Sequence, residues 1–213
     1  MCGRYSIVTP VEALEERFQV KVPPEYQPHY NAAPTQRLPA VLNKQPGTMS
    51  LPVWGITPKW AKSPNQRLIN ARAETVAEKP TFKQSFHNRR CLVPANSYYE
   101  WQKLPGGNKQ PYRIYDPGNN LISFAGLWEE HPEEGPAFII VTVSAPDKIS
   151  SIHDRMPAVL EPEARELWLS DTEDYESLQA MLQPYHEDSL QAVPISTQVN
   201  NVRNEGEELW EPA

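Results

Sequence analysis

The sequence predicts an α+β or mainly-β fold, in which short β-strands form a curved, barrel-like mixed sheet and a few helices flank it. Short apolar segments bounded by turn residues recur along the chain, and helix-period patterns are fewer. Prolines number 23 and glycines 9 among 213 residues, which is typical of short elements joined by stiff connections. The chain shows neither the strand–helix alternation nor the glycine-rich loop of a dinucleotide-binding fold. We expect a single domain over residues 1–213.

The helices are expected from caps and apolar spacing. The segment Thr9-Pro10-Val11-Glu12 predicts the first helix, with Thr9 as the cap, Pro10 in the first turn and Glu12 in a capping box. Apolar residues at positions 11, 14 and 18 would then share one face. Further helices are expected over residues 71–78, 146–152, 161–169 and 172–182.

The strands are expected from short apolar or alternating runs. A proline-rich loop should occupy residues 20–37, and an Asn-rich loop should follow the last strand. Residues 137–143, which read AFIIVTV, predict the most deeply buried strand. The expected strands cover residues 38–43, 50–55, 91–94, 97–101, 111–115, 121–127, 137–143 and 190–196.

Charge is distributed unevenly along the chain, whose formal net charge is −7. Residues 1–113 contain 16 Lys and Arg against 7 Asp and Glu, whereas residues 114–213 contain 4 against 20. Such asymmetry indicates a surface that faces a polyanion, although basic residues scattered over a solvated surface give the same count. The densest basic group contains Lys59, Lys62, Arg67, Arg72, Lys79, Lys83, Arg89 and Arg90.

Several functional classes do not fit this composition. No apolar run approaches the roughly 18 residues of a membrane span, and the first residues lack the apolar region of a secretory signal. We therefore expect a cytoplasmic chain with no membrane partner. Cys2 and Cys91 are expected to be free thiols. The five His and two Cys show no ligand spacing, so we expect no metal, and no cofactor is indicated.

Cys2 is the first candidate for chemistry. If Met1 is removed, the chain begins with a 1,2-aminothiol, whose α-amine has a reference pKa of roughly 7.7–8.0 and is partly neutral at pH 7. With an aldehyde, the amine would form an imine and the thiol would close a thiazolidine ring; with an acyl group, the thiol would form a thioester. The alternative is a cysteine that merely follows the initiator.

Three other residues are candidates for acid–base or positioning roles. Glu100 lies among bulky aromatic residues, so desolvation should favour its protonated form, although a surface carboxylate is the ordinary alternative. His153 could move protons, or it could be structural. Asn70 could orient a substrate, or it could cap a helix. Tryptophans at 54, 60 and 101 are stacking platforms if exposed and core if buried.

Seven segments, taken together, are more specific than any single residue. They are residues 1–5 (MCGRY), 30–35 (YNAAPT), 54–58 (WGITP), 69–75 (INARAET), 91–101 (CLVPANSYYEW), 152–157 (IHDRMP) and 199–204 (VNNVRN). In this order they resemble the SOS response-associated peptidase (SRAP) family, whose members look like sensors of abasic sites. The resemblance extends over nearly the whole chain.

The resemblance implies a mechanism and a set of roles. After removal of Met1, the amine and thiol of Cys2 would condense with the ring-opened aldehyde of an abasic site in single-stranded DNA. The resulting thiazolidine crosslink would shield the lesion during the DNA damage (SOS) response. Asn70 would hold the deoxyribose, Glu100 would assist ring opening and proton transfer, and His153 would act on the sugar hydroxyl and in crosslink reversal. The family also implies autopeptidase cleavage after Met1 and a lyase-like cleavage through the Schiff base.

The same resemblance implies DNA contacts at matching positions. Phosphate contacts would give salt-dependent affinity without sequence preference, as a lesion sensor needs. Aromatic side chains would stack on or wedge apart bases next to the lesion. The residues concerned are Arg4, Arg72 and Arg155 for phosphates, Trp54 and Trp101 for stacking, Pro34 and Thr142 along the groove, and Lys79, where the match is loose.

Two departures from the family pattern and two alternative functions stay open at this point. Asn200 stands where a glycine is expected, although Asn also tolerates a left-handed backbone. The acidic carboxyl half leaves the extent of the DNA footprint open. The alternative functions are a general cysteine peptidase with a Cys2–His153 dyad and a non-covalent reader of modified or single-stranded DNA. We expect a monomer that is cytoplasmic and associates with the nucleoid when bound to DNA.

Overall fold

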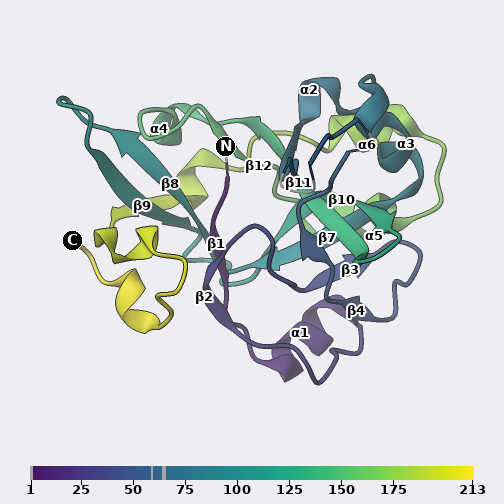
Figure 1. Cartoon of the computed structure of the whole chain (residues 1–213), viewed down its shortest axis with the longest axis horizontal. Helices are drawn as coiled ribbons and strands as arrows, with labels where there is room; N and C mark the ends of the chain where they lie inside the picture. The colour runs from purple at the N-terminus through teal and green to yellow at the C-terminus, as the bar shows by residue number, and fades with distance from the viewer. Residues whose placement is uncertain (1, 59, 64–65) are drawn as a thin grey trace.

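Two β-sheets form the framework of the chain in the computed structural model, which describes residues 2–58, 60–63 and 66–213. One is an antiparallel five-stranded sheet in the order β13-β9-β8-β1-β2. The other is a mixed eight-stranded sheet whose main path is β12-β11-β10-β7-β3-β4, with β5 and β6 beside β11 (Figure 1). Six α-helices are found among the described residues. The predicted α+β class with a curled mixed sheet is confirmed.

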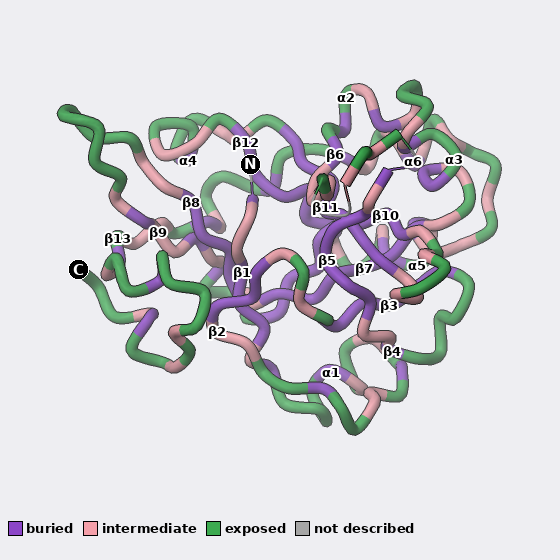
Figure 2. The backbone as a smooth tube through the Cα atoms, in the orientation of Figure 1, coloured by how far each residue is buried: buried purple, intermediate pink, exposed green. Residues whose placement is uncertain are grey.

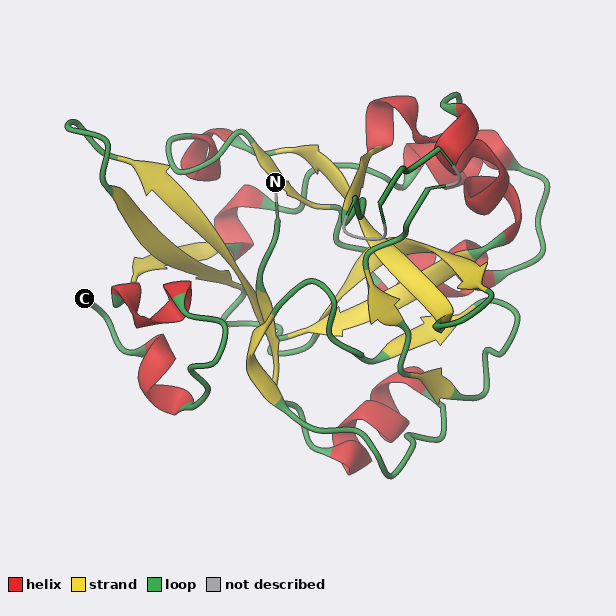
Figure 3. Cartoon of the chain, viewed as in Figure 1, coloured by secondary structure: helices red, strands yellow, loops and turns green. Residues whose placement is uncertain are grey.

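The strands are short except for the central hairpins. Their bounds are β1 (Tyr5–Ile7), β2 (His29–Ala32), β3 (Ala40–Leu42), β4 (Met49–Ser50), β5 (Val53–Trp54), β6 (Asn70–Arg72), β7 (Arg90–Ala95), β8 (Ser97–Lys103), β9 (Lys109–Tyr115), β10 (Ile122–His131), β11 (Gly135–Ser144), β12 (Arg155–Pro157) and β13 (Gln191–Pro194). The α-helices are α1 (Val11–Phe18), α2 (Ala73–Val76), α3 (Pro80–Asn88), α4 (Asp147–Ser150), α5 (Pro162–Leu169) and α6 (Tyr175–Ala180) (Figure 3). Three 3₁₀ turns, η1 (Glu187–Ser189), η2 (Thr197–Asn200) and η3 (Glu207–Trp210), complete the described elements.

The core lies where the apolar runs are longest. All six residues of β7 are buried, and β11 is buried from Ala137 to Val143, as expected for a strand covered on both faces (Figure 2). The helices α2, α3, α5 and α6 gather on the side of the eight-stranded sheet (Figure 1). β1 pairs with β8 and β2 of the five-stranded sheet, and in the view of Figure 1 the described residues that precede β1 lie between the two sheets.

Several element predictions are wrong at their edges. The first helix begins at Val11 and has no side-chain cap. The hydroxyl of Thr9 instead donates to Asn96 Oδ1 and accepts a hydrogen bond from Asn96 Nδ2. Four strands were missed because their apolar signal is short: β1 before the first helix, β2 within the predicted loop, β6 at the start of a predicted helix, and β12. Helix α3 was also missed, and the expected strand over 50–55 is divided into β4 and β5 at a proline, which cannot donate to a ladder.

Among the described residues, no helix is both long and apolar enough to traverse a bilayer.

Candidate active site at the amino-terminal cysteine

The thiol of Cys2 lies in a fully buried position beside the carboxyl group of Glu100. The pairing of Tyr5 with Tyr98 runs the residues before Tyr5 alongside the residues after Tyr98, toward Glu100. The Cys2 Sγ donates to the carbonyl oxygen of Arg4 over 3.6 Å. Burial raises the pKa of the Cys2 thiol, and the nearby charge of Glu100 raises it further. The thiol is therefore protonated at neutral pH, and its reaction needs a group that removes the proton.

Glu100 is an acid held in a dry environment. Only 2% of it is exposed, and its neighbours on β8, Tyr98 and Tyr99, are fully buried. Burial raises the pKa of Glu100 to about 7, and the negative charge of Asp154 acts in the same direction. A carboxyl group with this pKa is half-protonated at neutral pH and can both donate and accept a proton.

His153 faces Glu100 from the segment between α4 and β12. Its Nε2 lies 3.9 Å from Glu100 Oε2. Its Nδ1 accepts the backbone N–H of Arg155 at 3.0 Å and lies 3.1 Å from Asp154 Oδ1. Burial lowers the pKa of His153, whereas the attraction of Asp154 opposes this. Because the side chain of Asp154 is 83% exposed, its attraction is screened, and we assign a neutral ring with the proton on Nε2, toward Glu100.

Asn70 lies on β6, in register with Ile140 of β11. Its Nδ2 is 3.5 Å from the carbonyl oxygen of Ile140, and its Oδ1 is a buried acceptor without a hydrogen-bond partner among the described residues. These contacts connect Asn70 to the eight-stranded sheet. Its expected place against the sugar and Cys2 stays a prediction.

Comparison with known proteins decides the family. The model of the SOS response associated peptidase (SRAP) family matches residues 1–202. The chain belongs to the SRAP family. Abasic site processing protein YoqW of Bacillus subtilis is 38% identical over 99% of both chains. YedK of Escherichia coli, which carries the same description, is 34% identical over 100% of both chains. HMCES of Xenopus tropicalis, also an abasic site processing protein, is 31% identical over 84% of this chain and 64% of its own.

Solved structures share the fold. A crystal structure from Bacteroides thetaiotaomicron superposes with a TM-score of 0.86 at 24% identity, with all of both chains covered. A phage-related protein of Bordetella bronchiseptica gives a TM-score of 0.76 at 27% identity, over 92% of this chain and 95% of its own. The arrangement of sheets around β1 is therefore found in other proteins.

The residues that the SRAP resemblance assigns to DNA contacts differ in accessibility. Arg72 and Lys79 are exposed, and Pro34 and Trp101 are half-buried. Trp54 and Thr142 are fully buried. The Trp54 ring packs against Tyr5 and Phe138, and its indole N–H donates to the carbonyl oxygen of Ile69. Base stacking by Trp54 would require this part of the core to open. The other expected platform, Trp60, is 62% exposed.

Two of the arginines expected to hold phosphates already have protein partners. The guanidinium of Arg155 binds both oxygens of Glu74, at 2.6 and 2.9 Å. Arg4 donates through Nη1 to Asn31 Oδ1 and to the carbonyl oxygen of Val199, both at 2.7 Å, and lies over the ring of Trp101. For both residues the phosphate contact stays a prediction. For Arg155 it would compete with Glu74.

The basic group around residues 59–90 does not form one surface. Arg90 is fully buried, and its guanidinium donates to the carbonyl oxygens of Trp168, Phe86, His87 and Ser170. Arg67 donates to Glu134. Lys59 lies outside the described residues. The alternative in which these charges serve local structure therefore applies to Arg90 and Arg67.

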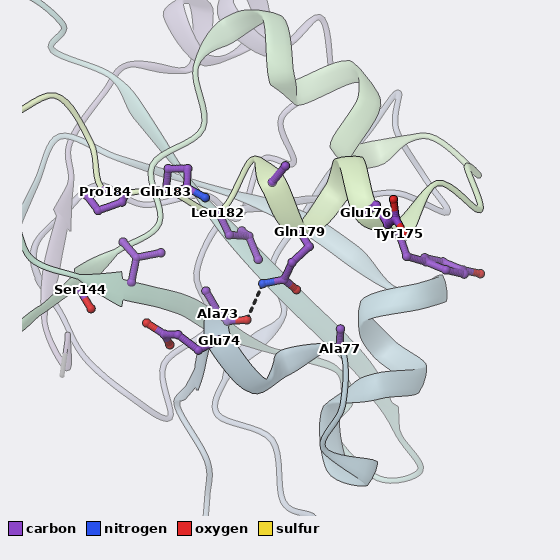
Figure 4. Close-up of a pocket in the computed structure, with 12 residues that line it drawn as sticks. Ala73, Glu74, Ala77, Ser144, Tyr175, Glu176, Gln179, Leu182, Gln183 and Pro184 are labelled. Atoms are coloured by element: carbon purple, nitrogen blue, oxygen red, sulfur yellow. Dashed lines mark hydrogen bonds between the residues drawn. The ribbon is translucent and has the colours of Figure 1, made fainter.

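A separate cavity of about 770 Å³ lies between α2 and α6 (Figure 4). Its lining is mostly apolar and does not include Cys2, Glu100 or His153. Glu74 is in the lining, but its carboxylate already accepts both hydrogen bonds from Arg155. The reactive groups are thus apart from this cavity, and we place the candidate site at Cys2.

Asn31 lies in the 30–35 segment, but no role for it is expected from the sequence. The structure shows it fully buried, with hydrogen bonds to Arg4 and to the loop that follows β13. The available signal was a polar residue followed by the small apolar residues Ala32 and Ala33, because an amide that is buried with them needs hydrogen-bond partners.

Proposed function

We propose that this chain processes abasic sites in single-stranded DNA by forming a covalent thiazolidine crosslink through Cys2, once Met1 has been removed. The observation that carries the proposal is the cysteine thiol buried beside Glu100, an acid with a pKa of about 7 that His153 also faces. The names of the SRAP relatives, abasic site processing proteins, support the substrate. Met1 itself lies outside the described residues.

The reaction balances with the loss of one water. The Cys2 amine adds to the aldehyde carbon of the ring-opened deoxyribose, and the carbinolamine loses water to give an imine. Protonated Glu100 donates to the departing oxygen, which leaves the imine nitrogen protonated and Glu100 as the carboxylate. The carboxylate then accepts the thiol proton as the sulfur adds to the imine carbon and closes the five-membered ring, so the nitrogen keeps its proton and Glu100 returns to the acid form. A pKa of about 7 suits both directions of transfer.

His153 and Asn70 complete the proposed mechanism. Neutral His153 exchanges a proton with the sugar hydroxyl when the ring opens, and again when the crosslink reverses. Asn70 holds the sugar through the carboxamide oxygen that has no described partner. Arg72 and Lys79, both exposed, offer phosphate contacts.

Two further activities belong to the same proposal. Removal of Met1 would be an autopeptidase step in which Cys2 and Glu100 take part. The imine intermediate also allows elimination at the adjacent sugar carbon, which is a lyase-like strand cleavage. We place the protein in the DNA damage response, acting as a monomer on DNA in the cytoplasm or nucleoid.

The test is an intact mass and a denaturing gel after mixing the protein with an abasic oligonucleotide. The wild-type protein should lack Met1 and gain the mass of the oligonucleotide less one water, and undamaged oligonucleotide should give no adduct. Cys2→Ala should abolish the adduct, while Cys91→Ala, which removes the other buried free thiol, should retain it.

Other outcomes would favour other functions. An adduct that persists in Cys2→Ala would rule out thiazolidine chemistry. Cleavage of unrelated proteins would favour a general cysteine peptidase. Binding that denaturant reverses and that is equal for undamaged DNA would favour a non-covalent reader.

A further inference from the structure

Asn31 of β2 is fully buried, and both ends of its carboxamide are used. Its Nδ2 is shared among the carbonyl oxygens of Val199, Asn201 and Asn204, at 3.3, 3.0 and 3.0 Å. Its Oδ1 accepts from Arg4 Nη1 at 2.7 Å. An apolar residue of the same size would leave these carbonyls and the guanidinium without this partner, which is costly in a buried position.

The carbonyls belong to residues 197–205, here named the C-terminal loop. This loop also touches the strand that carries the acid, because Trp101 Nε1 donates to Asn200 Oδ1 at 2.7 Å. Glu205, at the end of the loop, accepts the backbone N–H groups of Tyr30 and Asn31 at 2.7 and 3.1 Å. The loop therefore contacts Trp101, which follows Glu100 in the chain. It also contacts Arg4, which lies two residues after Cys2.

The first residues have little other support from the sheet. The ladder between β1 and β8 pairs only Tyr5 with Tyr98 and Ser6 with Ser97, and the pairing of β1 with β2 is irregular between Tyr5 and Ile7. Beyond the ladder, the backbone N–H of Tyr99 donates to the carbonyl oxygen of Arg4. Cys2 thus lies beyond the last paired residue, where a small rotation of the chain displaces the sulfur from Glu100.

We propose that Asn31 is a positioning residue for the reaction of Cys2, acting through Arg4 and the C-terminal loop to hold the amino-terminal segment against β8. This inference rests on the proposed function for its effect on rate, but not for its effect on the structure around Cys2. Misplacement by about 1 Å can cost roughly 100-fold in rate, so this connection between distant parts of the chain has a large effect on reactivity.

The experiment compares Asn31→Ala with the wild-type protein by two readouts. The first is the rate of adduct formation against abasic oligonucleotide concentration. We expect the maximal rate constant to fall by about 10-fold or more, as misplacement of reacting groups predicts, while the half-saturating concentration changes by less than about threefold. The matched control is Asn88→Ala, which removes an exposed Asn whose Nδ2 bonds Gln84 within α3 and should change neither quantity.

The second readout needs no DNA. Native alkylation by iodoacetamide, followed by peptide mapping, reports Cys2 and Cys91 separately in the same sample. In Asn31→Ala we expect Cys2 to be alkylated at least about 10-fold faster and Cys91, which lies in β7 away from the C-terminal loop, to be unchanged. Equal acceleration of both cysteines would show a general loss of stability and overturn the positioning role, as would unchanged Cys2 alkylation with an unchanged rate.

A second variant keeps the test decisive if Asn31→Ala does not fold. Asn200→Ala removes only the exposed partner of Trp101 and should leave the melting temperature unchanged. We expect a smaller acceleration of Cys2 alkylation, about threefold, with Cys91 unchanged. No change at Cys2 would overturn the role of the C-terminal loop. If the wild-type protein forms no adduct, the proposed function fails, while the alkylation pattern still decides the role of Asn31.

Discussion

The pKa values of two carboxyl groups, Glu100 and Glu74, are shifted in opposite directions. Glu100 of β8 is 2% exposed, and burial raises its pKa to about 7. Glu74 of α2 has a half-exposed side chain, and its hydrogen bonds to Arg155 hold its pKa below the ordinary value. One carboxyl group faces a thiol and an imidazole, and the other faces a guanidinium.

The difference shows how the same side chain becomes either a reactive group or a structural one. A permanently charged partner fixes the carboxylate form, so Glu74 cannot exchange protons near neutral pH. For Glu100 burial is the largest influence on the pKa, and the negative charge of Asp154 acts in the same direction, so the acid form persists up to about pH 7. This contrast supports the proposed role of Glu100 in proton transfer, whereas Glu74 supports β12 through Arg155.

The largest expected effect is the loss of acid–base catalysis in Glu100→Gln. The amide keeps the shape but cannot exchange protons, so the rate of adduct formation should fall by roughly 10²–10⁴-fold. The wild-type rate should also decline above pH 7, where Glu100 becomes ionised and stops donating, and this decline should be absent in the variant. Single-turnover rates from pH 5 to 9 measure both.

Glu78→Gln, an exposed change on the segment after α2, is the control for that series. A Glu100→Gln protein that crosslinks at the wild-type rate and keeps the alkaline decline would remove Glu100 from the mechanism.

The next largest effect is that of Glu100→Gln on stability. The substitution lowers the reaction rate, but it should raise the free energy of unfolding at alkaline pH. The unfolded carboxyl ionises near its ordinary pKa of 4.5, whereas the folded one stays protonated up to about 7. Ionisation of Glu100 therefore favours unfolding. The contribution of its protonated form to the free energy of unfolding is full below pH 4.5 and is lost as pH rises to about 7. The total loss is about 3 kcal/mol. Glu100→Gln should thus be more stable than wild type at pH 8 and similar at pH 4.

Urea denaturation at both pH values checks this difference, and taking variant minus wild type removes the pH dependence of all other groups. A variant that is less stable than wild type at pH 8 would mean that ionised Glu100 is stabilised by its surroundings.

The environment of Glu100 could be predicted from the sequence, because the residues that determine it are its neighbours in the chain. Two tyrosines immediately before Glu100 predict desolvation, and the raised pKa confirms this. All four residues from Ser97 to Glu100 are buried, so β8 is covered on both faces where it carries the acid. The approach of His153 to Glu100 follows from a motif resemblance, and the structure brings the two side chains within 3.9 Å.

The sequence was insufficient where the partner is distant. Arg155 was expected to hold a phosphate, but its binding to Glu74 depends on the approach of α2 to β12, across 81 positions. For Trp54 the residues alone leave a stacking platform and a core position open, and the family resemblance implies stacking; its burial depends on Tyr5 and Phe138 from two other strands. Arg90 looked like part of a basic surface until its four carbonyl partners from α3 and the end of α5 were known. No periodicity or motif encodes such long-range partners.

The smallest effect tests the structural carboxylate. Glu74→Ala leaves the Arg155 guanidinium, 8% exposed, without its charged partner. Because Glu74 itself is half-exposed and screened, we expect the free energy of unfolding to fall by about 1–3 kcal/mol at pH 7, which is less than the cost of breaking a fully buried pair.

The pH dependence of this effect follows from the lowered pKa of Glu74. The contribution of the Glu74 carboxylate to stability is present above its ordinary pKa and is lost as pH falls below it. The difference from wild type should therefore shrink toward pH 3, measured by urea denaturation with Glu78→Ala as the control. Equal stability at pH 7 would mean that Arg155 does not depend on Glu74. It would then be available for a DNA phosphate, as the sequence predicted, and the salt dependence of oligonucleotide binding should weaken in Arg155→Gln.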